Sequence, residues 1–494
     1  MKKILFLSLF VYSFLIFLEI KGQVKVLTLE QTITIANESS LEAFRSKNLY
    51  LTGYWAYRSY RAERLPSLTF NMTPAQYYRD IVRRYDSGDN IDIYRTQQSF
   101  YSSGNLAIQQ NFDILGGTFF LDSDLGFIQN FGMNSYSQFT TVPIRIGYSQ
   151  SLLGYNPFKW DKKIEPLKYE KTKKELLYNL EQTAELATKY FFDLAMAQAE
   201  YNLAKNNVAS ADTLYAIGEE RHRIAAISQA DLLTLKLDKI NAYNSLNNSE
   251  ISRKRAMFSL ASYLNFDQNV EIQIILPAKP RKIIVSADDA LRLAKENNPK
   301  FLELKQNILE ADRDMDKSRK ESIWNVSFRA SVGFNQVADK FREAYRNPLQ
   351  QDIVALSLSM PLIDWGVRKG RYNMAKNNLN VITIAAQQET LSLEEDIIMT
   401  VQDFIVQQNM IARADEALDI AILAYEETKQ RFIIGKADIN SLTLSLNRQQ
   451  EAQRNYITAL QNYWCSYFKI RKLTLHDFET GISLSDLFDY KLGM

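Results

Sequence analysis

The stretch that decides the fold is residues 366–431, which centres on the run IIMTVQDFIVQQNMIARADEALDIAILAY (397–425). Its only glycines, Gly366 and Gly370, stand at its start, and it contains no proline. At ~1.5 Å per residue, about 65 helical residues span roughly 95–100 Å, far more than a compact domain. The apolar residues return at spacings of three, four and seven, the pattern of helices that wind round one another: Ile397, Val401, Phe404, Ile411, Leu418, Ile422 and Tyr425.

A second stretch, from about Lys159 to Arg221, has the same character. A shift of 210 positions, the difference between Tyr215 and Tyr425, aligns the two stretches. A shift of 258 positions, the difference between Ala36 and Ala294, aligns the segments that precede them. The sequence therefore predicts two tandem repeats, and the first carries an insertion of 48 residues, the difference between the two shifts. The apolar seam of the earlier stretch is formed by Leu176, Leu180, Ala184, Ala187, Phe191, Leu194, Ala197 and Tyr201.

Each repeat also contains a region of strands, which we expect at about residues 66–153 and 324–364. Val354, Leu356 and Leu358, for example, form an apolar row that alternates with small or polar residues. Such alternation is typical of transmembrane β-barrels and also of soluble β-sandwiches, and the strands alone do not decide between them. The insertion predicts one further hairpin at about residues 104–130, either in the wall of strands or outside it. Residues 77–101 and 130–138 are expected to form surface loops.

The expected domain organisation follows from these repeats. Residues 1–22 have a basic start and an apolar run, as a secretory signal peptide does. The first repeat takes residues 23–264, with its helical hairpin at about 157–264, and a linker at 265–284 joins it to the second. The second repeat takes residues 285–473, with its hairpin at about 366–473. A tail, residues 474–494, is expected to lie beside the helices.

Composition excludes several classes of function. The formal charge of +2 and the lack of a basic stripe argue against a nucleic-acid partner. One cysteine, Cys465, and two histidines, His222 and His476, form no recognisable catalytic, metal or cofactor site. We therefore expect no enzyme, no cofactor and no metal. After residue 23 no window approaches the ~18–20 consecutive apolar residues that a membrane-spanning helix needs.

Together the signal segment, the tandem repeats, the two long helical hairpins and the alternating strands resemble the TolC-like outer-membrane efflux proteins. The resemblance covers nearly the whole chain after the signal segment. Its sharpest local match is the turn between the long helices of the second repeat, where residues 431–435 read RFIIG and Ser441-Leu442 follows. A returning helix rich in alanine, arginine and tyrosine comes next.

The resemblance implies a fold, a function and partners. The fold is mainly α with a β region: long helical hairpins form a tunnel across the periplasm, and the strands of three chains form one transmembrane β-barrel. Four strands per chain are expected, which gives twelve strands in a homotrimer. The function implied is the outer-membrane channel of a tripartite efflux or type I secretion system in a Gram-negative bacterium. Its partners are a periplasmic adaptor, an inner-membrane transporter and outer-membrane lipid. The alternative is a secreted periplasmic coiled-coil scaffold or adaptor protein without a channel.

The resemblance also implies site residues at the periplasmic tips of the helical hairpins. In place of the family's two lumen-facing aspartates near the second tip this sequence has Ser441 and Leu444, which puts an acidic ring in doubt. The alternative for the charged tip residues is that they are solvated side chains at helix ends. The exported substrate cannot be read from the sequence. Candidate gate residues are Arg221, Arg223, Asp231, Arg431 and Asp438, and candidate adaptor-docking residues are Ile224, Ala225, Ile434 and Gly435.

Overall fold

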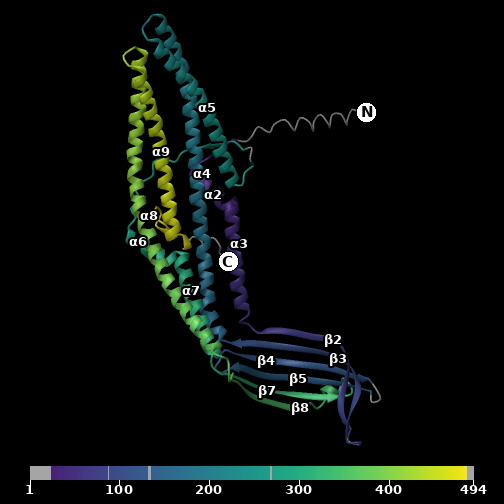
Figure 1. Ribbon diagram of the computed structural model, residues 1–494. Helices are drawn as coiled ribbons and strands as arrows, with labels where there is room; N and C mark the ends of the chain where they lie inside the picture. The colour runs from purple at the N-terminus through teal and green to yellow at the C-terminus, as the bar shows by residue number, and fades with distance from the viewer. Residues whose placement is uncertain (1–23, 87, 132–134, 268–269, 487–494) are drawn as a thin grey trace, which may run out of the picture. The chain divides into compact units, whose positions relative to one another are not determined.

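The computed structural model describes residues 24–86, 88–131, 135–267 and 270–486 (Figure 1). The expected signal segment, residues 1–22, lies outside the described residues. The chain divides into two compact units, which are described separately below. One contains the described residues up to Leu51, Thr172–Phe301 and the residues from Thr390 onward. The other contains Thr52–Lys171 and Leu302–Glu389.

The two repeats have the same order of elements, two helices, a region of strands and then two long helices. Helices α4 and α8 contain 67 residues each. Helices α8 and α9 each begin 210 positions after their counterparts α4 and α5. The long helices and the offset that the sequence predicts are thus confirmed. The helices are α2 (Leu29–Ser39), α3 (Leu41–Ala62), α4 (Pro157–Arg223) and α5 (Gln229–Tyr263), then α6 (Ala287–Asn297), α7 (Pro299–Glu321), α8 (Val367–Ile433) and α9 (Ile439–Thr474).

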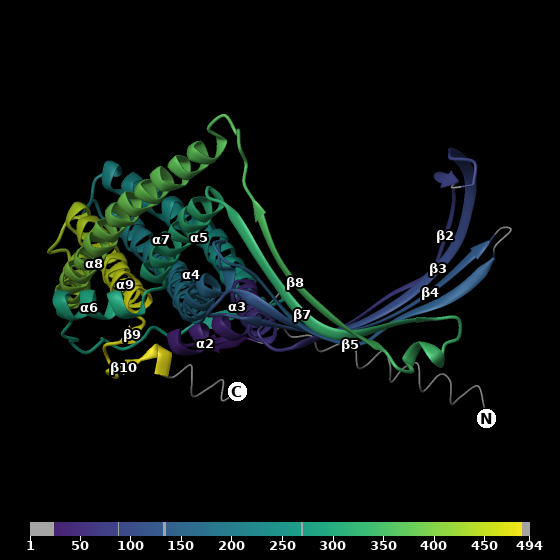
Figure 2. The same ribbon diagram turned by 90° about the horizontal axis from the view of Figure 1, so that it is seen from below.

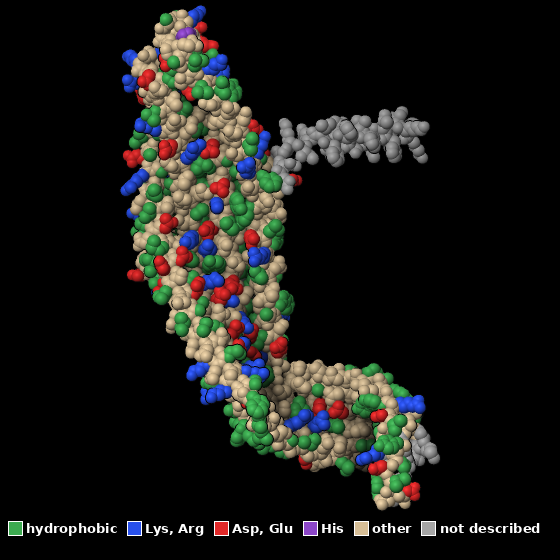
Figure 3. Space-filling model, viewed as in Figure 1, with side chains coloured by type: hydrophobic (Ala, Val, Ile, Leu, Met, Phe, Trp, Pro, Cys, Tyr) green, Lys and Arg blue, Asp and Glu red, His purple; other side chains and the backbone are tan. Residues whose placement is uncertain are grey.

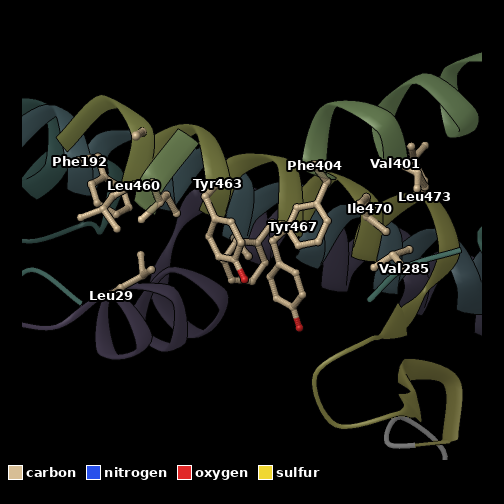
Figure 4. Packing of buried hydrophobic residues seen from close by; sticks show 14 of the residues in the cluster. Leu29, Phe192, Val285, Val401, Phe404, Leu460, Tyr463, Tyr467, Ile470 and Leu473 are labelled. Carbon is tan, nitrogen blue, oxygen red and sulfur yellow. The ribbon is translucent and has the colours of Figure 1, made fainter. Parts of the chain in front are cut away.

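Four residues of the apolar seam of α8 face the core of the first unit, whereas Ile422 of the same seam is 39 % exposed. Ile397, Val401, Phe404 and Ile411 are each at most 2 % exposed. Phe404 packs against Tyr463 of α9 with ring centroids 5.2 Å apart, and Figure 4 shows both rings within the cluster. Burial of such a side chain contributes about 1.5–3 kcal/mol, so the seam holds these helices together. Other labelled members of the cluster are Leu29, Phe192, Val285, Leu460, Tyr467, Ile470 and Leu473.

A buried ion network fastens the end of α9 to α4. The Arg471 guanidinium lies 2.9 Å from a Glu181 carboxylate oxygen and 3.5 Å from one of Asp477. The Tyr467 hydroxyl donates a hydrogen bond of 2.5 Å to Asp477. Burial raises the pKa of Glu181, although the charge of Arg471 opposes that shift. The first residues of the predicted tail are therefore anchored, and they form two short strands, β9 (His476–Asp477) and β10 (Ile482–Ser483).

The expected linker contains a strand as well. In that segment β6 (Ile272–Ile274) pairs in parallel with β1 (Lys25–Leu27) near the start of the described chain. This pairing connects the beginning of the first repeat to the segment that follows it. Leu27 and Ile272 are at most 5 % exposed and belong to one apolar cluster with α4 and α5 residues.

The second unit contains one antiparallel sheet of six strands in the order β2-β3-β4-β5-β7-β8. Figure 2 shows that this sheet is strongly curved. Each strand runs opposite to its neighbours. The strands are β2 (Ser67–Asp86), β3 (Ile91–Phe112), β4 (Gly117–Phe131), β5 (Tyr136–Ser151), β7 (Asn325–Ala338) and β8 (Leu349–Ser359).

The sheet has six strands rather than the four that the resemblance implies, because the further hairpin predicted at about residues 104–130 lies within it, in β3 and β4. The prediction of a loop at residues 77–101 is wrong, since β2 and β3 continue through most of it as a long hairpin. Of the loop predicted at residues 130–138, residues 130 and 131 end β4 and residues 136–138 begin β5, while residues 132–134 lie outside the described residues. Tyr77 and Tyr78 alternate in direction along β2, yet they are 58 % and 52 % exposed. A strand that is exposed on both faces needs no apolar alternation, so its sequence resembles a loop.

Candidate functional site

The two hairpin tips have the same backbone geometry. Ala225 and Gly435 occupy equivalent positions in the repeats and both have a positive φ, 59° and 81°. After each, a backbone amide returns to the last turn of the long helix: Ala226 donates to Arg221 at 2.8 Å, and Lys436 donates to Arg431 at 2.7 Å. A left-handed residue at this place ends a helix and suits glycine best. Both tips are therefore sharp turns that are fixed by their own backbone hydrogen bonds.

Arg221 connects one tip to the other. Its guanidinium donates a hydrogen bond of 3.2 Å to the backbone carbonyl of Ile433 and lies 5.5 Å from the centre of the Phe432 ring. A Cβ at Gly435 would stand 2.9 Å from the Arg221 Nη2 atom. The missing side chain at Gly435 thus leaves room for the arginine. Of the candidate gate residues, Arg221 is the one that the structure brings against the opposite tip.

Below this contact an apolar cluster joins the two hairpins. Leu235 of α5 packs with Tyr425 and Phe432 of α8 and with Ile439 and Leu442 of α9. Each of these five side chains is at most 9 % exposed. This tip cluster is large enough to hold the hairpins of one chain together while the outermost residues, Ile224 and Ile434, stay exposed at 71 % and 63 %.

The other charged tip residues serve their own helices. Ser228 and Asp231 form a capping box at the start of α5, and Asp438 caps α9 by accepting a 2.7 Å hydrogen bond from the Ser441 amide. The hydrogen bonds from Ser441 lower the pKa of Asp438. Arg223 pairs at 2.5 Å with Glu220, one turn earlier in α4.

Because Asp231 and Asp438 cap helices, they agree with the alternative that the charged tip residues are side chains at helix ends. Arg431 is exposed.

The sheet has one apolar face, and that face is exposed. Val354 is 77 % exposed, Leu356 is 66 % and Phe70 is 65 %. In a soluble sandwich such a face would be covered by a second sheet. Contiguous exposed apolar surface of this kind marks a membrane or partner contact. The register places on this apolar face Leu68, Phe70, Met72, Leu106, Ile108, Phe119, Leu121, Ile144, Ile146, Tyr148, Phe328, Val332, Phe334, Val354, Leu356 and Leu358.

The opposite face is polar and carries an ion cluster that spans three strands. Arg145 of β5 donates to Asp122 of β4 at 2.9 and 2.5 Å and to Asp124 at 3.2 Å. Asn105 of β3 donates to Asp124 at 2.6 Å. Figure 3 shows acidic and basic side chains together in the hollow of the sheet. This polar face includes Asn71, Asn105, Thr118, Asp122, Asp124, Arg145, Ser149, Arg329 and Ser331.

The sequence analysis did not identify this ion cluster. The signal was available, because Asp122 and Asp124 are two apart on one strand and so share a face. What the sequence lacks is the register that sets Asp122 opposite Arg145.

None of the described helices is both long and apolar enough to cross a membrane. Within the same part of the chain, no group of three or more metal-ligating side chains comes together.

Solved structures share this fold. The chain is similar to the CmeC outer membrane channel of Campylobacter jejuni, with 12 % identity, a TM-score of 0.65 and 94 % of this chain and 88 % of that chain covered. It is similar to a membrane protein from Pseudomonas aeruginosa, with 12 % identity, a TM-score of 0.63 and 90 % of each chain covered. The open state of the MtrE outer membrane channel of Neisseria gonorrhoeae has 14 % identity, a TM-score of 0.60 and 90 % and 88 % coverage.

No family model matches the sequence, and no curated protein matches it. At these identities the likeness shows the fold. The chain has a TolC-like fold, and the predicted fold class of two repeats with long helical hairpins and a region of strands is confirmed.

Proposed function

We propose that this chain, with its TolC-like fold, is the outer-membrane channel component of a tripartite efflux or type I secretion system. In this proposal three copies form one passive conduit, with the sheets in the outer membrane and the helical hairpins in the periplasm of a Gram-negative bacterium. The conduit does no chemistry. An inner-membrane transporter supplies the energy and a periplasmic adaptor joins it to the channel.

The observation that carries the proposal is the exposed apolar face of the sheet. Side chains such as Phe70, Val354 and Leu356 are 65–77 % exposed in the single chain. Transfer of apolar surface out of water contributes about 25 cal/mol for each Å², so lipid contact would stabilise this face strongly. Alternation of an apolar lipid face with a polar lumen face is the pattern of membrane barrels.

The polar face fits the lumen of such a conduit. Arg145, Asp122 and Asp124 are paired with one another, so the wall would present charge to water without an unpaired buried ion. Their pairing across β4 and β5 also holds neighbouring strands in register. A lumen that carries polar or charged cargo needs a wet wall of this kind.

The gate in this proposal is the set of hairpin tips, with Arg221 as its principal residue. Its hydrogen bond to the other tip is exposed, and a bond of this kind makes a net contribution of only about 1 kcal/mol. Repetition in three chains adds these small terms, and a gate that must open needs contacts that break easily. Arg431, Asp231 and Asp438 would have supporting roles, the aspartates by fixing the start of the returning helices, whereas Arg223 pairs only within α4 and has no part in this gate.

Adaptor docking is proposed at the outermost tip residues. Ile224 and Ile434 are exposed apolar side chains beside the left-handed residues Ala225 and Gly435, in both repeats. Three chains would thus present six similar apolar points to a partner.

The second candidate, a secreted periplasmic coiled-coil scaffold or adaptor protein, does not account for the apolar face of the sheet. A soluble scaffold would have to leave that face in water or bury it against an unknown partner.

Fractionation of cells that express the full chain tests the proposal. We expect the protein in the outer-membrane fraction as a trimer that resists SDS until it is heated. Recovery of the protein as a soluble periplasmic rod would refute the proposed function and favour the scaffold.

A further inference from the structure

The inserted hairpin of the first repeat lies in the middle of the sheet. Strand β7 begins 258 positions after β2, so these two strands are counterparts in the repeats, whereas β3 and β4 have no counterpart. Strand β4 pairs with β3 along its whole length and with β5 on its other side. The insertion is therefore paired on both flanks and separates β2 from β5.

We infer that each chain contributes all six strands to the membrane wall, so that three copies close a barrel of eighteen strands rather than twelve. The new contact is between β2 of one copy and β8 of the next. The inference rests on the proposed trimeric channel, and it adds the position of the inserted hairpin and the width of the pore.

The two edge strands suit this contact. Because directions alternate through the six strands, β2 and β8 run in opposite senses, and β8 of one copy can pair antiparallel with β2 of the next. Closure of three copies in this way gives an even number of antiparallel strands, as bacterial barrels have. An uncovered edge is not tolerated in lipid, since its backbone groups find no water there.

The apolar face also continues without a break from one edge to the other. On β2 the exposed apolar residues are Leu68, Phe70 and Met72, at 60–65 %. On β8 they are Val354, Leu356 and Leu358, at 59–77 %. In the inserted hairpin Phe119 has the same direction, because its register partner Tyr148 lies on this face of β5. A second copy placed edge to edge therefore extends one continuous lipid-facing surface.

The ion cluster of the polar face connects the inserted hairpin, β3 and β4, to β5 of the sheet. Asn105 of β3 is bonded to Asp124 of β4, and Asp124 and Asp122 are bonded to Arg145 of β5. The side chains of Asp122 and Arg145 are 11 % and 20 % exposed. If the hairpin left the wall so that β2 met β5 directly, these ions would lose their partners. The cluster thus favours the six-stranded arrangement over a four-stranded one with an external hairpin.

The pore would be about half as wide again as in a twelve-stranded barrel. With strands about 4.8 Å apart and tilted by about 40°, eighteen strands give a backbone diameter of about 36 Å. Twelve strands with the same spacing and tilt give about 24 Å. The extra strands bring their own polar residues, such as Asn105 and Thr118, into the lumen.

Electron microscopy of the purified full-chain trimer in lipid nanodiscs tests the inference. We expect eighteen strands in the wall and a backbone diameter of about 36 Å. A trimer with twelve strands and a diameter of about 24 Å would overturn the inference and leave the proposed channel intact.

Cysteine labelling in intact outer membranes is the second measurement. In a Cys465→Ser background, Thr118→Cys is expected to react with a water-soluble maleimide, and Phe119→Cys only with a lipid-soluble one. The matched pair on β5 is Ser149→Cys and Tyr148→Cys, register partners of Thr118 and Phe119 that belong to the wall in either arrangement. Equal reaction of both β4 variants with the water-soluble reagent, while the β5 pair alternates, would overturn the inference. If the β5 pair does not alternate either, the membrane wall itself, and with it the proposed function, is refuted.

Discussion

An arginine on the apolar face of β8 gives the sharpest test of which face meets lipid. Val354 is 77 % exposed and near the middle of the strand, so Val354→Arg removes little packing within the chain. In water, such a change at an exposed site would alter the free energy of unfolding by about 0.5 kcal/mol or less. Near the midplane of a bilayer an arginine costs about 2–4 kcal/mol for each chain, or about 6–12 kcal/mol for three copies. We therefore expect far fewer trimers.

The neighbouring residue is a matched control. Ile353 is also β-branched, but it points to the polar face, where its register partner is Ser331. We expect Ile353→Arg to cost about 1 kcal/mol or less, because the guanidinium reaches water. The assay is the amount of heat-modifiable trimer in outer-membrane fractions at equal expression, followed by the urea midpoint of the purified trimers. Equal losses for the two variants, or a greater loss for Ile353→Arg, would refute our assignment of the faces.

Two further predictions concern the tips and the tail. Ala225→Gly should raise, and Gly435→Ala should lower, the free energy of unfolding of the helical hairpins by about 1 kcal/mol each, because only the first relieves a left-handed alanine. Changes of the same sign in urea unfolding would contradict this reading. Burial opposes the shift, but the hydrogen bond from Tyr467 and the charge of Arg471 lower the pKa of Asp477. Its stabilising contribution is complete above the ordinary carboxyl pKa of about 4 and is lost as the pH falls through the lowered value. The thermal midpoint of wild type should therefore fall more between pH 6 and pH 3 than that of Asp477→Asn, and an equal fall would contradict the role of this carboxylate.

The helical part of the fold was predictable because apolar residues recur along each long helix at a regular spacing. A seam such as Ile397, Val401, Phe404 and Ile411 repeats with the helix, and the four side chains are buried as that period requires. The equal length of the two long helices follows from an alignment of the repeats without a gap.

The length and pairing of the strands were not predictable in the same way. A hairpin such as residues 77–101 has solvent on both faces, so its sequence carries no alternation to detect. Its pairing depends on the register with distant residues, and the register is a property of the folded sheet.

At the tips, the partners of individual side chains could not be predicted from the sequence either. Asp231 and Asp438 were named as candidate gate residues, but a carboxylate at the start of a helix has unpaired backbone amides close by, and both of them cap their helices. Arg221 bonds to the backbone carbonyl of Ile433, which any residue type would supply. No sequence pattern predicts that a backbone carbonyl will be the partner of an arginine.

Conductance in planar lipid bilayers tests the central claim, that three copies of this chain form a conduit closed at its tips. We predict that purified full-chain trimers give discrete current steps, and that Arg221→Ala trimers stay open longer because the bond to Ile433 is lost. Arg223→Ala, which removes only a pair within α4, should behave as wild type. Trimers that insert into the bilayer but conduct no current, in wild type and in Arg221→Ala alike, would contradict the account.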